Sequence, residues 1–455
     1  MWFVLADNAK NFLERMGMNT MNMQDKEKAF CHWAPFLHFY QPPTQDAHVL
    51  REIDTTCYEP LFRMLLDNPE FRMTFNVNTI LIDLLIDHGL NRTVEMLKEL
   101  VDKRQVEIVG SGKFHPILPL IPKQEVLHQI DLQEKDLKKI FHGWEKSGFF
   151  PPEMAISPSI ASLLNNEGYK WVISSGIACS AEWPYDKIYQ QDGLLLFFRD
   201  DVISNEISFK KISVEFFIDK LKMLYKTPHY IITAQDGETF GHHVPHYERT
   251  FLETALRMAV EDKDIELCWV SDLPNHFPVD GKIRLVSSSW STSQGDIDDN
   301  TPYPLWNHPD NQVHKVQFKF LKNVLELVYL LEANKGSKDI QEATTARYFL
   351  DRGLHSCQLW WASARPMWSP NLILKGAELL LRAAFNARLA IIDNIQDKDV
   401  IADSEEYFDQ ATQYYSMLLT EIMKKDQAIA GKRAEHESLF DDLFTSDAET
   451  KEDKQ

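Results

Sequence analysis

The sequence predicts an α/β protein built as a parallel (β/α) barrel with a helical domain after it. From residue 34 to about residue 270, short apolar segments alternate with longer amphipathic ones, and this alternation implies a mainly parallel sheet. Polar residues stand where several apolar segments end, as expected for a site at the carboxyl mouth of a barrel. A doubly wound open sheet is the competing architecture, and we disfavour it because no glycine-rich phosphate turn follows an early strand.

The apolar segments of this region are predicted to be strands, because they are short and bounded by polar or turn-forming residues. They are 34–40, 72–77, 106–110, 171–175, 194–199, 230–234 and 265–270. Longer amphipathic stretches between them predict helices, for example over 78–88, 123–142, 214–225 and 244–260. We therefore expect the barrel over residues 31–280.

The chain changes character after the barrel. Residues 281–311 predict an ordered loop region, because they combine turn formers with aromatic residues and are too apolar for a flexible linker. Residues 312–430 predict a helical domain, in which apolar residues recur three or four positions apart on one helix face. The first of these are Val313, Val316, Phe320, Val324, Leu327 and Leu331.

Two further features concern the ends of elements and of the chain. Ser369-Pro370 predicts the start of a helix, with the hydroxyl as its cap and proline in the first turn. We expect a variable leader without chemistry over residues 1–30 and an acidic, disordered tail over residues 431–455.

The composition excludes several classes of partner. The net charge of −20 argues against nucleic acid and against anionic membrane surfaces, whereas a neutral sugar is compatible with an acidic, aromatic-rich protein. The five cysteines are scattered and form no CxxC pair, which argues against a disulfide framework and a thiolate zinc site. No apolar run reaches the length of a membrane span, and the start does not resemble a signal peptide. We expect a cytoplasmic protein.

Two acidic segments contain the candidate catalytic residues. Glu153 follows two prolines, which present it at a stiff bend. Asp236 follows the apolar segment 230–234 and enters a turn that also contains Glu238, His242 and His243. Cleavage of a glycosidic bond needs two carboxyl groups, one ionised and one protonated. Both residues also have a purely structural interpretation. Glu153 could stand at the start of the next helix, where the helix dipole favours a negative charge, and Asp236 could be an ordinary turn residue.

Other polar and aromatic residues are open to two interpretations. His38 and His115 stand at the ends of predicted strands, where barrel sites are built, but a single strand histidine is often a core residue. Trp360 and Trp361 could wall a sugar site or simply pack in the helical domain. A zinc site built from His38, His115, Asp236, His242 and His243 has no supporting short motif in the sequence.

Taken together, these segments resemble glycoside hydrolase family 57, the retaining α-glucan-active enzymes. The resemblance covers about residues 34 to 390 and rests on five segments in order: His38…Gln41-Pro42, Gly110…His115-Pro116, Pro152-Glu153, Asp236-Gly-Glu-Thr-Phe-Gly-His242 and Cys357…Trp360-Trp361-Ala-Ser363. It implies a distorted seven-stranded parallel barrel followed by helices, with no metal and no other cofactor required. It also implies Glu153 as nucleophile and Asp236 as general acid/base.

The resemblance further implies residues that bind the reacting sugar of an oligo- or polysaccharide, an α-glucan. The substrate-binding set is His38, Tyr40, Gln41, His115, Glu238, His242, Trp360 and Trp361. Two departures bear on substrate preference: Tyr40 stands where many members carry a second histidine, and Pro-Pro-Glu-Met stands where characterised members commonly have Ala-Glu. Two alternatives stay open, a carbohydrate-binding protein without turnover and a zinc-dependent α-mannosidase-like hydrolase on a related barrel.

Overall fold

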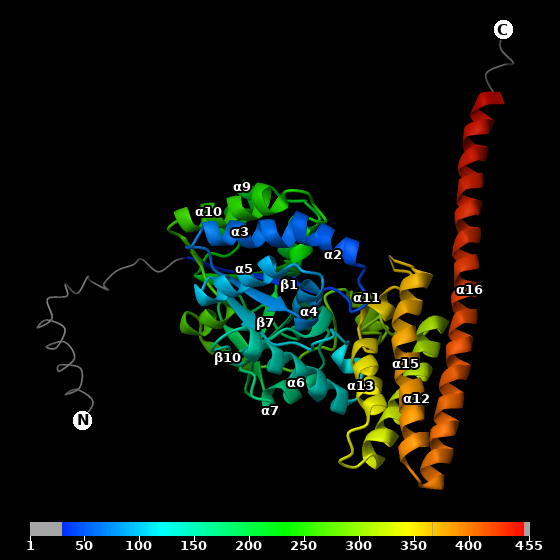
Figure 1. Ribbon diagram of the computed structural model, residues 1–455. Helices are drawn as coiled ribbons and strands as arrows, with labels where there is room; N and C mark the ends of the chain where they lie inside the picture. Colours follow the sequence, from blue (N-terminus) through cyan, green and yellow to red (C-terminus); the bar gives the residue numbers. More distant parts are fainter. Residues whose placement is uncertain (1–29, 366, 450–455) are drawn as a thin grey trace, which may run out of the picture.

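The computed structural model describes residues 30–365 and 367–449, so the expected leader lies almost wholly outside the described residues. The barrel and the helical domain lie side by side (Figure 1). The described strands are β1 (Cys31–Phe39), β2 (Met73–Val77), β3 (Val106–Val109), β4 (Gly148–Phe149), β5 (Trp171–Ser175), β6 (Ile188–Gln191), β7 (Leu194–Arg199), β8 (His229–Asp236), β9 (Ile265–Leu267) and β10 (Val279–Lys282).

Helices connect these strands and cover the outside of the barrel. The α-helices of this part are α2 (Ala47–Ile53), α3 (Glu59–Asp67), α4 (Thr79–Asp87), α5 (Asn91–Asp102), α6 (Lys123–Ile140), α7 (Pro158–Asn166), α8 (Asp201–Ser208), α9 (Val214–Met223) and α10 (Thr254–Glu261). Short 3-10 or π-helical turns complete it: η1 (Asp54–Tyr58), η2 (Leu118–Leu120), η3 (Pro152–Met154), η4 (Gly176–Ala178), η5 (Gly237–Thr239), η6 (Glu248–Glu253) and η7 (Val270–Asn275).

Parallel strands form the barrel in the order β3-β2-β1-β8 and, in a second sheet, β7-β5-β4. A parallel bridge between Gly110 and Phe149 joins β3 to β4. On the other side, the amide of Asp200 after β7 donates to the carbonyl of Ile232 in β8 (2.9 Å). The predicted parallel barrel is confirmed, and β1, β2, β3, β4, β5, β7 and β8 surround its interior.

Four strands differ from the sequence prediction. β4 contains two residues, too few to produce a recognisable apolar segment. β6 pairs antiparallel with β7, and the exposed β10 extends that edge. The predicted strand 265–270 is shorter, because β9 ends at Leu267, and it lies outside the ring, where it pairs with the first residues of β1.

β1 is the central strand, and all nine of its residues are buried. It pairs with β8 along almost its whole length, with β2 through Phe36–Phe39 and with β9 through Cys31–Trp33. A strand buried on both faces forms a nearly continuous apolar run, which is why the sequence located it well. The registers place Asp236 and Asn76 beside His38 at its carboxyl end.

The loop region and the helical domain follow the barrel. They contain α11 (Gln294–Asp298), α12 (Gln312–Asn334), α13 (Gln341–Gly353), α14 (Cys357–Trp360), α15 (Pro370–Asn394) and α16 (Lys398–Glu449). Tyr303 and Trp306 of the loop region are buried and pack on Ile117 and Ala155 of the barrel, so this region is ordered. The six apolar residues predicted for one helix face all lie in the buried core of the domain.

Two predictions in the helical domain differ from the structure. α15 begins at Pro370 as expected, but the side chain of Ser369 makes no capping hydrogen bond. α16 continues to Glu449 and projects past the rest of the molecule (Figure 1), where a disordered tail was expected from residue 431. The reason is that residues 432–449 contain neither proline nor glycine and are compatible with a continued helix.

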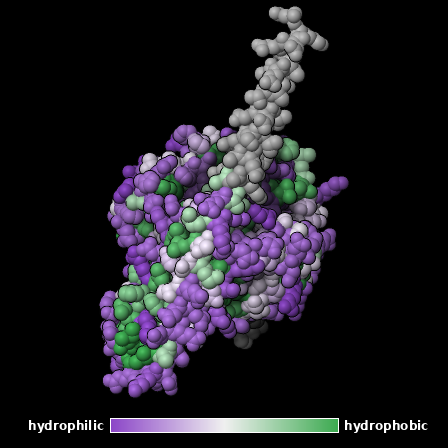
Figure 2. Space-filling model, turned by 90° about the vertical axis from the view of Figure 1, so that its right-hand side faces the viewer, coloured by the Kyte–Doolittle hydropathy of each residue, from purple (hydrophilic) through white to green (hydrophobic). Residues whose placement is uncertain are grey.

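The face of the molecule in Figure 2 is mostly hydrophilic, with smaller hydrophobic groups between the polar residues. The exposed apolar side chains of α15 and α16 are Phe385, Ile392, Met417, Leu419 and Met423. Among the described residues, none of the helices combines the length and the hydrophobicity that crossing a membrane requires.

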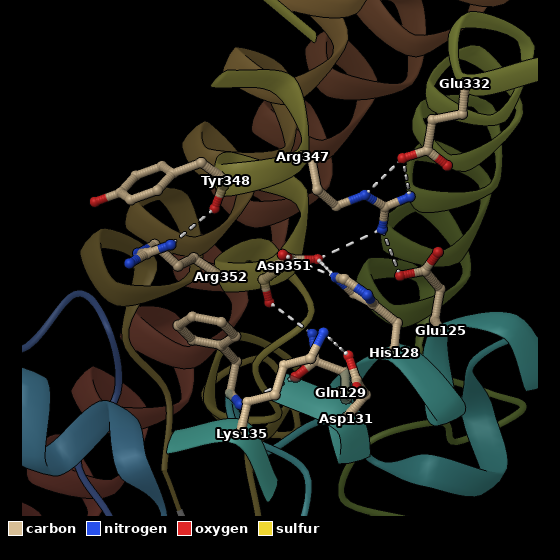
Figure 3. Close-up of polar contacts among 11 residues, drawn as sticks. Glu125, His128, Gln129, Asp131, Lys135, Glu332, Arg347, Tyr348, Asp351 and Arg352 are labelled. Atoms are coloured by element: carbon tan, nitrogen blue, oxygen red, sulfur yellow. Dashed lines mark hydrogen bonds and ion pairs between the residues drawn. The ribbon is translucent and has the colours of Figure 1, made fainter. Parts of the chain in front are cut away.

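A charged cluster fixes the helical domain to the barrel (Figure 3). The guanidinium of Arg347 in α13 pairs with Glu125 of α6 (2.8 Å) and with Glu332 of α12. Asp351, one turn after Arg347, accepts a hydrogen bond from His128 of α6 (3.1 Å). The side chain of Glu125 is fully buried, so its charge depends on Arg347 for compensation.

Replacing Arg347 by methionine should therefore lower the free energy of unfolding by about 3–5 kcal/mol, because a buried carboxylate loses its partner. Urea unfolding followed by circular dichroism measures the change. Arg382 is the matched control, since it forms an exposed pair with Glu378 one turn away, and Arg382→Met should cost less than about 1 kcal/mol. Equal losses in the two variants would contradict a special role for the interdomain cluster.

Candidate active site

Side chains from separate strands meet at the carboxyl mouth of the barrel. Parallel strands end at the same edge of the sheet, so residues far apart in sequence come together there. The residues concerned are His38 near the end of β1, Asn76 of β2, His115 after β3, Glu153 after β4, Arg199 at the end of β7 and Asp236 at the end of β8.

Glu153 is held in a constrained conformation after β4. Two prolines precede it, and both Glu153 (φ 59°) and Met154 (φ 49°) have left-handed backbone conformations. Such conformations cost of order 1–3 kcal/mol each in residues other than glycine. The main chain of Trp290 donates to the Glu153 carbonyl (3.2 Å), and the indole Nε1 donates to the carboxylate Oε2 (2.8 Å). The surroundings therefore orient this carboxyl group.

The alternative role of Glu153 in a helix terminus does not apply. α7 begins at Pro158, its cap is Ser157, and its first turn contains no acidic residue. The Glu153 side chain is about one-fifth exposed (21%), and its Oε1 lies 3.8 Å from Nδ1 of His115. The carboxyl group thus points into the mouth of the barrel and not toward a helix dipole.

Asp236 is the last residue of β8 and is the register partner of His38. Gly237 follows it, and a side chain at that position would collide with the ring of Phe39. Glycine therefore lets the end of β8 lie close against β1. Asp236 also lines a cavity of about 440 Å³, together with Arg199, Phe209, Gln235, His243 and Trp290. This carboxyl group is thus accessible from a pocket large enough for part of a sugar chain.

Both carboxyl groups have raised pKa values. Burial, together with the charge of Asp236, raises the pKa of Glu153 to about 8, although the hydrogen bond from Trp290 opposes the shift. Burial also raises the pKa of Asp236, while the charges of His38 and Arg199 act in the opposite direction. Two neighbouring carboxyl groups whose charged forms disfavour each other can hold one proton between them.

A chain of hydrogen bonds sets the tautomers of the two histidines. Because the Asn76 Oδ1 only accepts, His38 donates from Nδ1 (2.7 Å). His115 Nε2 then donates to His38 Nε2 (3.1 Å), and its Nδ1 accepts from the Ser356 hydroxyl (2.8 Å). Burial lowers the pKa of both histidines, so both are neutral at pH 7.

Tyr40 and Cys357 complete the wall on this side. The Tyr40 ring stacks on His115 with 3.9 Å between ring centroids and 11° between planes. The Cys357 Sγ lies 3.8 Å from the Tyr40 hydroxyl. Ser356 and Cys357 come from the helical domain, so that domain contributes directly to the site.

Glu238 is buried behind the mouth of the barrel. Its Oε1 accepts hydrogen bonds from Gln41 Nε2 (2.9 Å) and from the Tyr58 hydroxyl. Burial and the charge of Asp236 raise the pKa of Glu238 to about 7. Gln41 and Glu238 thus bind each other in the free protein and support the loop that carries Asp236.

Three other predicted binding residues have different contacts. His242 is half-buried on the turn after η5, where its ring contacts His243. Trp361 is buried in the core of the helical domain, and Trp360 is partly buried between this core and the loop region. The packing interpretation of the tryptophan pair therefore agrees with its position.

The zinc set considered from the sequence does not assemble. Nδ1 of His38 and Nδ1 of His115 are engaged with Asn76 and Ser356, and their Nε2 atoms with each other. Over the described part of the chain, the one group of three candidate ligands close enough to share an ion is His32, Glu266 and His276. That group lies at the other end of β1.

Sequence reasoning missed several residues of the site. Arg199 ends a predicted strand, and Trp290 lies in the loop region that is predicted to be ordered. Their positions in the sequence therefore offered a reason to consider both as site residues. Asn76, Tyr58 and Ser356 had none, because a polar residue inside an apolar segment or a helix is identified only by its neighbours in space.

Comparisons with known proteins agree with this arrangement. An alpha-amylase of Pyrococcus horikoshii is 24% identical over 309 residues, which cover 64% of this chain and 46% of that protein. A 4-alpha-glucanotransferase of Thermococcus litoralis is 24% identical over 271 residues, which cover 56% of this chain and 40% of that protein. The chain thus spans less than half the length of these relatives.

A solved structure resembles the whole fold. The family 57-type branching enzyme of Pyrococcus horikoshii superposes with a TM-score of 0.65 at 14% identity, and the match covers 87% of this chain and 96% of that one. At this identity the likeness concerns the fold. The sequence profile described as glycosyl hydrolase family 57 matches residues 12–285, more than half of the chain and almost all of the barrel. The chain therefore belongs to glycosyl hydrolase family 57.

Proposed function

We propose that this protein is a retaining glycoside hydrolase or glucanotransferase that acts on α-1,4-linked glucans. The observation that carries the proposal is the pair of Glu153 and Asp236 at the ends of β4 and β8, electrostatically coupled at the barrel mouth. The names of the relatives, alpha-amylase and 4-alpha-glucanotransferase, support this substrate class.

Glu153 is the proposed nucleophile. Its ionised carboxylate attacks the anomeric carbon and forms a glycosyl-enzyme, while Asp236 delivers its proton to the leaving oxygen. Asp236 then takes a proton from water or from a sugar hydroxyl, which attacks the intermediate and restores Glu153. A separation of about 5–5.5 Å between the carboxyl groups is the geometry that retention requires.

The surroundings of the pair suit these two roles. The Trp290 indole holds Oε2 of Glu153 by a hydrogen bond, which fixes the orientation of the attacking group and favours its ionised form. The positive charge of Arg199 stabilises the charge that Asp236 acquires when it gives up its proton. Neutral His38 and His115 add polar ring atoms to the wall of the site without adding charge.

The choice between hydrolysis and transfer depends on which acceptor reaches the intermediate. The cavity beside Asp236 can admit water or a sugar, since polar and aromatic side chains both line it. A linear maltooligosaccharide distinguishes the two outcomes, because hydrolysis yields only shorter chains and transfer yields chains both shorter and longer than the substrate.

Replacing Glu153 by glutamine should reduce turnover of maltoheptaose by roughly a thousandfold or more, because the amide keeps the shape and loses the nucleophile. Products separated by chain length measure the loss. Binding of the sugar should persist, and calorimetry with the variant checks it.

Glu145→Gln provides the matched control, since Glu145 is exposed and lies just before β4. It should retain wild-type turnover. Near-normal turnover in Glu153→Gln would refute the nucleophile assignment, and sugar binding without turnover in the wild type would favour a carbohydrate-binding protein.

The pair also predicts a bell-shaped pH dependence of kcat/KM. Below the lower pKa of the pair both carboxyl groups are protonated and no nucleophile is present. At higher pH the last proton of the coupled pair leaves, and no general acid remains. Rates with maltoheptaose measured between about pH 4 and pH 10 test this. A rate that keeps rising above about pH 9 would contradict the coupled pair.

A further inference from the structure

A second cluster of chemically active side chains lies at the amino-terminal end of the barrel. His32 of β1, Glu266 of β9 and His276 after η7 each offer one ligand atom, and these atoms all lie within 4.8 Å of one another. The strand register makes His32 and Glu266 direct neighbours. The three residues come from three separate segments, which only the fold brings together.

The spacing suits a tetrahedral metal ion. The His32 Nε2 and the Glu266 Oε2 are 3.3 Å apart. Two ligands about 2.0–2.1 Å from zinc at the tetrahedral angle are also about 3.3 Å apart. The rings of His32 and His276 have their centroids 4.3 Å apart at 45°, so a modest rotation of the exposed His276 completes the set.

The burial of the three residues distinguishes this cluster from a surface charge pair. His32 is only 6% exposed, whereas Glu266 is 49% exposed and His276 is exposed. The buried His32 is thus held in place, while the exposed side chains of Glu266 and His276 can change rotamer, and a water molecule can supply the fourth ligand. Two imidazoles and one carboxylate select a borderline ion such as zinc and not calcium, which prefers oxygen ligands alone.

The cluster is separate from the catalytic mouth. His32 and His38 lie six residues apart on β1, about 20 Å at the rise of a strand. Ala34, Phe36 and Phe277 fill the barrel interior with other apolar residues. An ion here would have no contact with Glu153 or Asp236.

We infer that His32, Glu266 and His276 bind a zinc ion that ties β1, β9 and the segment after η7 together at the amino-terminal end of the barrel. The ion would be structural, since β9 is a strand of three residues that pairs only with the first part of β1. An ion that binds the folded state and not the unfolded state raises the free energy of unfolding by mass action.

The test uses the full chain after chelation and dialysis, titrated with zinc chloride by calorimetry. The wild type should bind one zinc ion per chain and show a raised Tm, and calcium chloride should give neither effect. His276→Ala and Glu266→Gln, at exposed positions that the fold tolerates, should each weaken zinc affinity more than about tenfold. The exposed His142 is the control, and His142→Ala should bind as the wild type does.

Activity on maltoheptaose should be unchanged in the two ligand variants, which separates this inference from the proposed function. Cobalt should give visible ligand-field absorption in the wild type and lose it in His276→Ala. A wild type that binds no zinc, or variants that bind zinc as tightly as the wild type, would overturn the proposed site.

Discussion

The register of the central strand β1 against its neighbours is the constraint on which the rest of the structure depends. β1 is buried along its whole length and pairs with β8 on one side and with β2 and β9 on the other. A shift of one residue would turn every side chain to the opposite face, so the apolar core admits a single register. That register sets His38 between Asn76 and Asp236, and the electrostatics of the site follow from this placement.

The site concentrates unfavourable features that the surrounding structure has to stabilise. Glu153 and Met154 have left-handed backbone conformations, and two coupled carboxyl groups are both buried. Burying charge in this way is costly without partners, and the partners come from separate strands and from Trp290. Strained backbone and perturbed pKa values at one place are typical of an active site, which agrees with membership of a glycosidase family.

The helical domain is part of the site as well as a neighbour of it. Ser356 binds His115, Cys357 contacts Tyr40, and the Arg347 cluster fixes α13 on α6 behind them. The domain therefore supplies the hydrogen-bond partner of His115 Nδ1. Trp360 also packs on Ile117 and Ala155 of the barrel, whereas Trp361 is buried in the domain core.

The sequence by itself determined the class of fold, most of the long elements and the two carboxylates, because these depend on local periodicity and on short motifs. The strands 171–175 and 194–199 coincide with β5 and β7, and the apolar face of α12 is buried as expected. Only the tertiary structure decided the partners of those carboxylates. Trp290 reaches Glu153 and Arg199 lies near Asp236, while Asn76 and Ser356 bind the neighbouring histidines His38 and His115. The two-residue β4 exists because Gly110 and β5 flank it. Contacts of this kind arise from strand register and domain packing, which no local pattern of residues encodes.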